Sequence, residues 1–158
     1  MNKELKAYIK AEAVIAAAFN FFINGMVTAL IHHKADRVPT DISSIAIDLT
    51  LTCLPILILT SLFSRASITR TKTVGILETD SRVMLSLSRL FRHPVLFGVL
   101  IGFIITAALF ILTASAFALL GIYAIPFGFY VALKCVFAAL LGGGAVVLEL
   151  YTGMCKAE

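Results

Sequence analysis

Two opposite charges, Asp48 and Lys134, are the residues of this chain best placed to do chemistry, because each interrupts a long apolar run. An ionisable group at membrane depth is expensive, so we expect it to have a buried partner or a function. A carboxylate can take a proton or a cation, and a lysine ammonium can bind an anionic group. Asp48 and Lys134 therefore predict an ion pair that either locks two helices together or opens as a binding site.

Hydroxyl side chains accompany both charges at helical spacing. Thr52 follows Asp48 by four residues, and Tyr130 precedes Lys134 by four residues. Residues four apart lie on the same face of a helix, one turn from each other. We therefore expect each charge to share its helix face with a hydroxyl group that can bond to a ligand or to the opposite charge.

Two asparagines of the first apolar run, Asn20 and Asn24, have the same four-residue spacing. With a rise of about 1.5 Å per residue, Asn24, Asp48 and Lys134 all lie roughly 10 to 15 Å from the same side of the membrane. We expect three helices to form one polar layer in which the asparagines bond to the ion pair. The members of this predicted ion- or ligand-binding layer are Asn20, Asn24, Asp48, Thr52, Tyr130 and Lys134.

The composition indicates which elements position this layer. Hydrophobic residues make up 60% of the 158 residues, charged residues only 14%, and the mean hydropathy is +1.01. A soluble domain of this length cannot bury so much apolar surface, whereas four of its apolar runs are long enough to cross a bilayer. We predict an all-α integral membrane protein, a four-transmembrane-helix bundle in which residues 1–158 form a single membrane domain. The expected spans are 10–31, 41–63, 94–120 and 124–152.

The connection between the second and third spans ends in an amphipathic stretch, 79–93. Apolar residues recur there at helical spacing, while Arg82, Arg89 and Arg92 take the other face. This pattern predicts a short amphipathic helix that lies at the inner surface of the membrane. Its arginines either recognise an anionic lipid or a protein partner, or they act as an anchor that follows the positive-inside rule.

The connection between the third and fourth spans, Gly121 to Pro126, is short and uncharged. It predicts that these two spans form a tight antiparallel hairpin. Glycine within a helix is unfavourable unless a neighbouring helix approaches closely. We therefore expect Gly98, Gly102 and the three glycines at 142–144 to pack inside this hairpin, or to support self-association.

The distribution of basic residues predicts the orientation of the spans. Of the 13 lysines and arginines, ten lie in segments that emerge on one side of the membrane, two on the other side, and the last is Lys134. Basic residues near span ends are retained on the cytoplasmic side. We therefore expect both termini in the cytoplasm, with the chain in the cell membrane or an inner membrane.

Two glutamates near the predicted cytoplasmic ends of the spans, Glu12 and Glu149, suggest a second polar constellation. Small residues join Lys134 to Glu149 along one stripe of the fourth span, and Glu12 begins a similar stripe on the first span. If these stripes face each other, they form an ion or proton route with a possible inner gate at the two glutamates. The alternative is that both carboxylates extend to the inner interface, near basic residues.

The motifs of other functional classes are missing from the sequence. His32, His33 and Asp36 have the chemistry of metal ligands, but no further ligand stands at a diagnostic spacing, so we expect no metal. No phosphate-binding loop, dinucleotide fingerprint or nucleophile elbow occurs, so we expect neither an enzyme nor a cofactor. The basic residues lie mainly in the loops of one side, which explains the positive charge without nucleic acid.

Two functions of different classes remain open. The first is a small transporter or channel for an ion or a solute. It would work as a homo-oligomer in the lipid bilayer, because a four-helix bundle of this size is expected to fill its interior with its own side chains. The alternative is a non-transporting membrane sensor, accessory subunit or scaffold, in which Asp48 and Lys134 form a structural lock.

Overall fold

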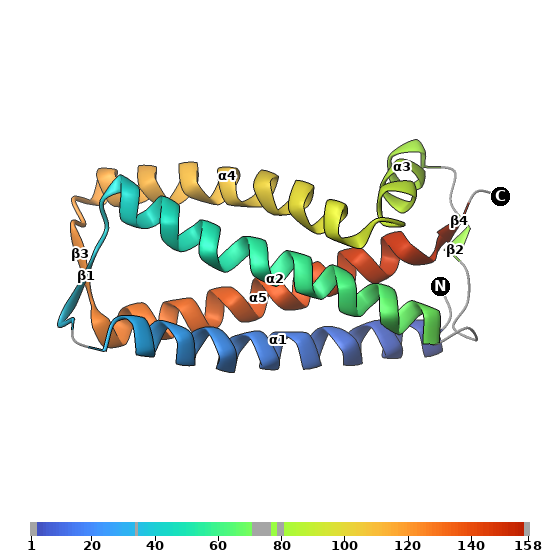
Figure 1. Cartoon of the computed structure of the whole chain (residues 1–158), viewed down its shortest axis with the longest axis horizontal. Coiled ribbons are helices and arrows are strands. Elements are labelled where there is room, and N and C mark those ends of the chain that lie inside the picture. Colours follow the sequence, from blue (N-terminus) through green and yellow to red (C-terminus); the bar gives the residue numbers. More distant parts are fainter. Residues whose placement is uncertain (1–2, 34, 71–76, 79–80, 157–158) are drawn as a thin grey trace.

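A computed structural model of the chain describes residues 3–33, 35–70, 77–78 and 81–156. Within these residues it contains five helices and two short pairs of strands (Figure 1). The helices are α1 (Lys3–Ile31), α2 (Ile42–Arg70), α3 (Arg82–Leu90), α4 (Pro94–Leu120) and α5 (Phe127–Met154). The strands are β1 (Arg37–Pro39), β2 (Leu77–Glu78), β3 (Ala124–Pro126) and β4 (Cys155–Lys156).

Four of the helices, α1, α2, α4 and α5, are long and apolar enough to cross a membrane. This confirms the prediction of four long apolar helices. The bounds of α4 match the expected 94–120, because Pro94 favours the first turn of a helix and Gly121 ends it in the left-handed conformation, with φ of 63°.

The other three long helices differ from the expected bounds. α1 begins at Lys3 rather than at 10, α2 continues to Arg70 rather than ending at 63, and α5 runs from Phe127 to Met154 rather than over 124–152. Hydropathy shows where an apolar run ends, whereas helical hydrogen bonds continue through polar residues that find partners. The polar ends of α1 and α2 meet at such a contact, in which Ser67 donates to Glu12 across 3.1 Å.

The predicted amphipathic helix is present as α3, but it is shorter than 79–93. Residues 79–80 lie outside the described part of the chain. Ser81 caps the helix by accepting a hydrogen bond from the Met84 amide across 3.4 Å, and the helix ends before Phe91. Its arginine side chains are exposed, while the face towards α5 is half-buried.

The last two long helices do not pack against each other in the way that the sequence predicted. α5 packs lengthwise against α1, and α2 packs against both α4 and α5, so α2 and α5 form the centre (Figure 1). The predicted tight hairpin of the last two spans is therefore wrong, because the close neighbour of α4 is α2. A Cβ atom added to Gly98 would lie 2.7 Å from Leu57 O and 2.8 Å from Ile58 Cα, so this glycine permits the approach of α4 to α2.

The glycines of α5 serve a different contact from the one expected. Gly142 lies against the side chain of Asn20, and Gly143 lies against Ala13 and Ala17, all on α1. These glycines therefore support the packing of α5 on α1 instead of a hairpin with α4.

The connections at one end of the bundle form a ribbon that the sequence did not predict. β1 and β3 pair in antiparallel fashion, with Val38 opposite Ile125 (Figure 1). Both side chains are buried, with 4% and 5% of their surface exposed. Residues 124–126 were expected to be helical, but strand pairing satisfies the backbone groups of two short connections at once. This end of the bundle is referred to below as the ribbon end.

α1 begins and α5 ends at the opposite end, which is referred to below as the terminal end (Figure 1). There β2 pairs with β4 in parallel, and Ser88 of α3 donates to Cys155 O across 3.1 Å. The apolar core of this end consists of Leu5, Ile9, Val146, Leu150 and Met154.

Candidate functional site

Asp48 and Lys134 are in direct contact between α2 and α5. Lys134 Nζ donates to Asp48 Oδ2 across 2.7 Å, and it also donates to the hydroxyl of Thr52. Thr52 in turn donates to the backbone carbonyl of Asp48 across 2.7 Å. The four-residue spacing on α2 thus places both oxygen ligands of the ammonium group on one face.

Tyr130 completes this group of side chains, referred to below as the ribbon-end site. Its phenol is a hydrogen-bond partner of the Asp48 carboxylate, and its ring meets the ring of His32 edge to face at 5.4 Å between centroids. The Lys134 ammonium also lies 5.9 Å from the centroid of the Phe137 ring. The charge pair is therefore enclosed by aromatic rings from α5 and one hydroxyl from α2.

The amide groups of the two asparagines do not donate to the ion pair, contrary to the expectation from the sequence. Asn20 Nδ2 donates to Ala16 O across 2.9 Å, and Asn24 Nδ2 donates to Asn20 O across 3.1 Å, so both amides bond within α1. Helix spacing placed the asparagines at a similar depth, but it did not determine which face of α1 turns towards α2. Asn20 belongs instead to the contact with Gly142.

The ribbon-end site lies on the wall of a cavity of about 460 Å³. Side chains of all four long helices line it, including Asn24 on α1, Thr113 on α4, and the members of the site. The Asp48 side chain is 30% exposed, whereas that of Lys134 is 7% exposed. The carboxylate is therefore the partner that faces the open space.

The ribbon covers this cavity with apolar side chains. Val38 of β1 and Ile125 of β3 pack with Tyr130, and Phe117 of α4 joins the same cluster. Val38 and Phe117 also line the cavity. The part of the cavity wall nearest the ribbon is therefore apolar.

A second polar site, referred to below as the terminal-end site, lies further along the same two helices. Glu149 of α5 is 1% exposed. Three hydroxyls of α2 surround its carboxylate: Ser61 lies 2.6 Å and Thr60 3.0 Å from Oε1, and Ser64 lies 2.8 Å from Oε2. The interpretation that this glutamate extends to a surface near basic residues is therefore wrong.

The hydroxyls of the terminal-end site were missed by the sequence analysis. Thr60, Ser64 and Ser67 follow one another at spacings of four and three residues, which places them on one face of α2. This row was the available signal, but hydropathy treats Ser and Thr as neutral and does not reveal it. The expected polar line between α1 and α5 also differs in its partners, because Lys134 and Glu149 both bond to α2.

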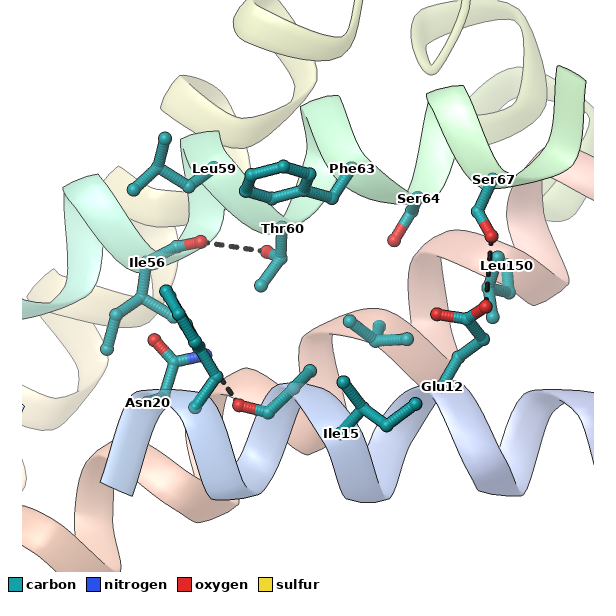
Figure 2. A pocket seen from close by; sticks show the side chains of 13 residues that line it. Glu12, Ile15, Asn20, Ile56, Leu59, Thr60, Phe63, Ser64, Ser67 and Leu150 are labelled. Atoms are coloured by element: carbon teal, nitrogen blue, oxygen red, sulfur yellow. Dashed lines mark hydrogen bonds between the residues drawn. The ribbon is translucent and has the colours of Figure 1, made fainter. Parts of the chain in front are cut away.

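A cavity of about 310 Å³ lies between α1 and α2 beside the terminal-end site (Figure 2). Its lining is mainly apolar, with Ile15 and Phe63 among its residues. Figure 2 shows Thr60 and Ser64 turned towards this space, and Glu12 reaching from α1 to Ser67. Glu12 lines this cavity. Glu149 does not line it, but it is hydrogen-bonded to Thr60 and Ser64, which do.

The described residues include no cluster of three His, Cys, Asp or Glu side chains that could hold a metal ion. His33 Nδ1 lies 2.8 Å from Leu30 O, and the ring of His32 contacts Tyr130. No family model, curated protein sequence or solved structure matches this chain. The functional argument therefore rests on the two polar sites and their cavities.

Proposed function

We propose that this chain is a small integral membrane transporter or channel for a small ion or solute, and that the ribbon-end site binds what is carried. The observation that carries this proposal is the position of the ion pair on a cavity lined by all four long helices. A purely structural lock would be expected in a closely packed seam between two helices, because open space beside a charge pair adds nothing to stability.

The exposure of the two charges favours a cationic solute. Asp48 presents its carboxylate to the cavity, whereas Lys134 is almost completely covered. An amine at the exposed side of this carboxylate would donate a charge-assisted hydrogen bond, and a metal cation would be coordinated by the same oxygen atoms, while Lys134 stays covered. Thr52 and Tyr130 supply further polar groups for such a ligand.

The proposed orientation has both termini in the cytoplasm, so that the ribbon end faces outwards. It is supported by the basic residues, most of which lie at the terminal end in the described part of the chain. They are Lys3, Lys6 and Lys10 on α1, Arg65 and Arg70 on α2, Arg82 and Arg89 on α3, Arg92 beyond it, and Lys156 on β4. The exposed arginines of α3 are then available to anionic lipids or to a protein partner.

A homo-oligomer was predicted because a bundle of this size was expected to have no space inside it for a transport path. Both cavities lie within one chain, so a bundle of this size does not fill its interior with side chains. The proposed transport path therefore requires no second copy, and assembly becomes a separate question for cross-linking in native membranes.

The test of this proposal is an electrical measurement on purified protein reconstituted in liposomes. Concentration jumps of Na⁺, K⁺, protons or methylammonium are applied on a solid-supported membrane, with chloride as the anionic comparison. We expect at least one of the cations to evoke a protein-dependent current. The current should disappear in the double variant D48N/K134M, which removes both charges and so leaves neither member of the pair without its partner.

The matched control is D41N, because Asp41 stands just before α2 and is fully exposed. Its carboxylate bonds to Ser43 and Ser44 at the start of the helix and does not line the cavity of the ribbon-end site, so the current should persist. Currents of equal size in wild type and the double variant would contradict the proposal. The absence of any current from wild type would also contradict the proposal. The interpretation as a sensor, accessory subunit or scaffold would then be preferred.

A further inference from the structure

Glu149 is a buried carboxylate whose negative charge no cation balances in the part of the chain that the structure describes. It forms no ion pair within the described residues, although its side chain is 1% exposed. An ionised carboxylate is far more expensive to bury than a neutral one, and such groups usually become neutral. Either a proton or a bound cation must therefore offset this charge for at least part of the time.

The surroundings of Glu149 offer hydrogen bonds but little charge. On the side of α4, the space next to it is lined by Phe97 and Ile101, which are apolar. On α2, Arg65 follows Ser64 in sequence but makes no ion pair with Glu149. The titratable group of α1 at this level, Glu12, would disfavour a negative charge on Glu149 rather than balance it.

The hydroxyl of Thr60 allows the site to satisfy both protonation states. Its oxygen lies 2.9 Å from Ile56 O and 3.0 Å from Glu149 Oε1, but it has a single hydrogen to donate. When Glu149 is ionised, Thr60 can donate to the carboxylate. When Oε1 carries a proton, the carboxyl group can donate to Thr60, whose own hydrogen then bonds to Ile56 O.

The two serines donate in either state. Ser61 donates to Oε1 and Ser64 donates to Oε2, and both oxygens retain a lone pair for this purpose in the neutral acid. Neither gain nor loss of the proton leaves a buried polar group without a partner. A site that served only to fix α5 against α2 would not need this property.

A polar row connects this site with the terminal end. Thr60 and Ser64 contact Glu149 and also line the cavity of about 310 Å³ (Figure 2). Ser67 follows one turn later on α2 and bonds to Glu12, and its oxygen lies 2.5 Å from the Tyr8 hydroxyl. The row therefore leads from the buried carboxylate to a half-buried glutamate near the start of α1.

We propose that Glu149 is a reversible proton-binding site that is reached from the terminal end along this row of hydroxyls. The carboxylate takes up one proton and becomes a neutral carboxylic acid, and it releases the same proton on return to the ionised form. A coupling of this proton to the movement of a solute at the ribbon-end site rests on the proposed function. The binding of the proton to Glu149 is independent of that function.

The test is infrared difference spectroscopy of the protein in lipid vesicles, titrated over the pH range in which circular dichroism shows that it stays folded. The wild type should show a carboxylic-acid C=O band that grows as the pH falls. The part of this band that belongs to Glu149 should be lost in E149Q. It should be retained in E12Q, with its midpoint moved to lower pH, because that variant removes a negative charge that disfavours ionisation of Glu149. In S64A the band should move to higher frequency, because the carbonyl oxygen Oε2 loses a hydrogen bond.

Identical titrations of wild type and E149Q would overturn the proposal, whether Glu149 stays ionised or stays protonated throughout. If E149Q does not fold, S64A decides, because an unshifted band in that variant assigns the titration to another carboxyl group. The proposed transport is tested separately by the current that depends on Asp48. A titrating band without such a current rejects the transporter but keeps the proton site, and the converse result rejects only the proton site.

Discussion

Lys134 Nζ donates to Asp48 Oδ2 across 2.7 Å, but the two partners are unequally covered, with 7% of the lysine side chain and 30% of the aspartate side chain exposed. The cost of an unpaired charge depends on how much solvent or open space it can reach. The two single substitutions of this pair should therefore have unequal effects on stability.

We expect D48N to lower the stability more than K134M. D48N leaves the covered Lys134 ammonium without a negative charge beside it, and losing one partner of a buried pair costs about 3 to 5 kcal/mol. K134M leaves a carboxylate that the cavity can hydrate or that can take a proton. The double variant D48N/K134M should lie close to wild type. Thermal unfolding in detergent, followed by circular dichroism, measures all four proteins.

A reversed order, or strictly additive effects in the double variant, would show that the pair contributes little coupling energy. The ion pair would then not be a stabilising interaction of the ribbon-end site. The same set of proteins supports the reconstitution experiments, because the double variant is the one that should fold normally without either charge.

Gly98 should tolerate no side chain, because the backbone of α2 lies where a Cβ would be. The added carbon of G98A would lie 2.7 Å from Leu57 O and 2.8 Å from Ile58 Cα, and backbone atoms cannot move aside cheaply. Overpacking of this kind costs about 1 to 3 kcal/mol. We expect G98A to lower the unfolding temperature and to separate α4 from α2.

Gly144 provides the matched control, since no atom lies within 4 Å of a Cβ added there. G144A should raise the stability by up to about 1 kcal/mol, because alanine is the better helix former. If G98A were as stable as G144A, the close approach of α4 to α2 would be wrong. The predicted hairpin of α4 with α5 would then have to be reconsidered.

The proposed orientation can be tested with a thiol reagent that does not cross membranes. Arg37 of β1 and Ser86 of α3 are exposed at opposite ends of the bundle. In intact cells, R37C should be labelled at once, whereas S86C should be labelled only after permeabilisation. The wild type is the control, because its three free cysteines are all buried. Labelling of S86C in intact cells would reverse the orientation.

Much of the fold follows from the sequence, because the physical cause is local. Apolar runs of sufficient length produce the four long helices, and proline and glycine determine both ends of α4. The amphipathic repeat around Arg82 and Arg89 produces α3. The order of packing does not follow, because it depends on which faces of distant helices fit together, and Gly98 could have met either α2 or α5.

The contact between the two charges of the ribbon-end site could be predicted from the sequence. Asp48 and Lys134 are opposite in sign and lie at similar depth, so burial alone favours their contact. Only the tertiary structure shows that their contact borders a cavity, that both asparagines bond within α1, and that Glu149 lies among three hydroxyls of α2. These properties depend on the rotation of each helix about its own axis, which packing between distant residues decides and local sequence does not.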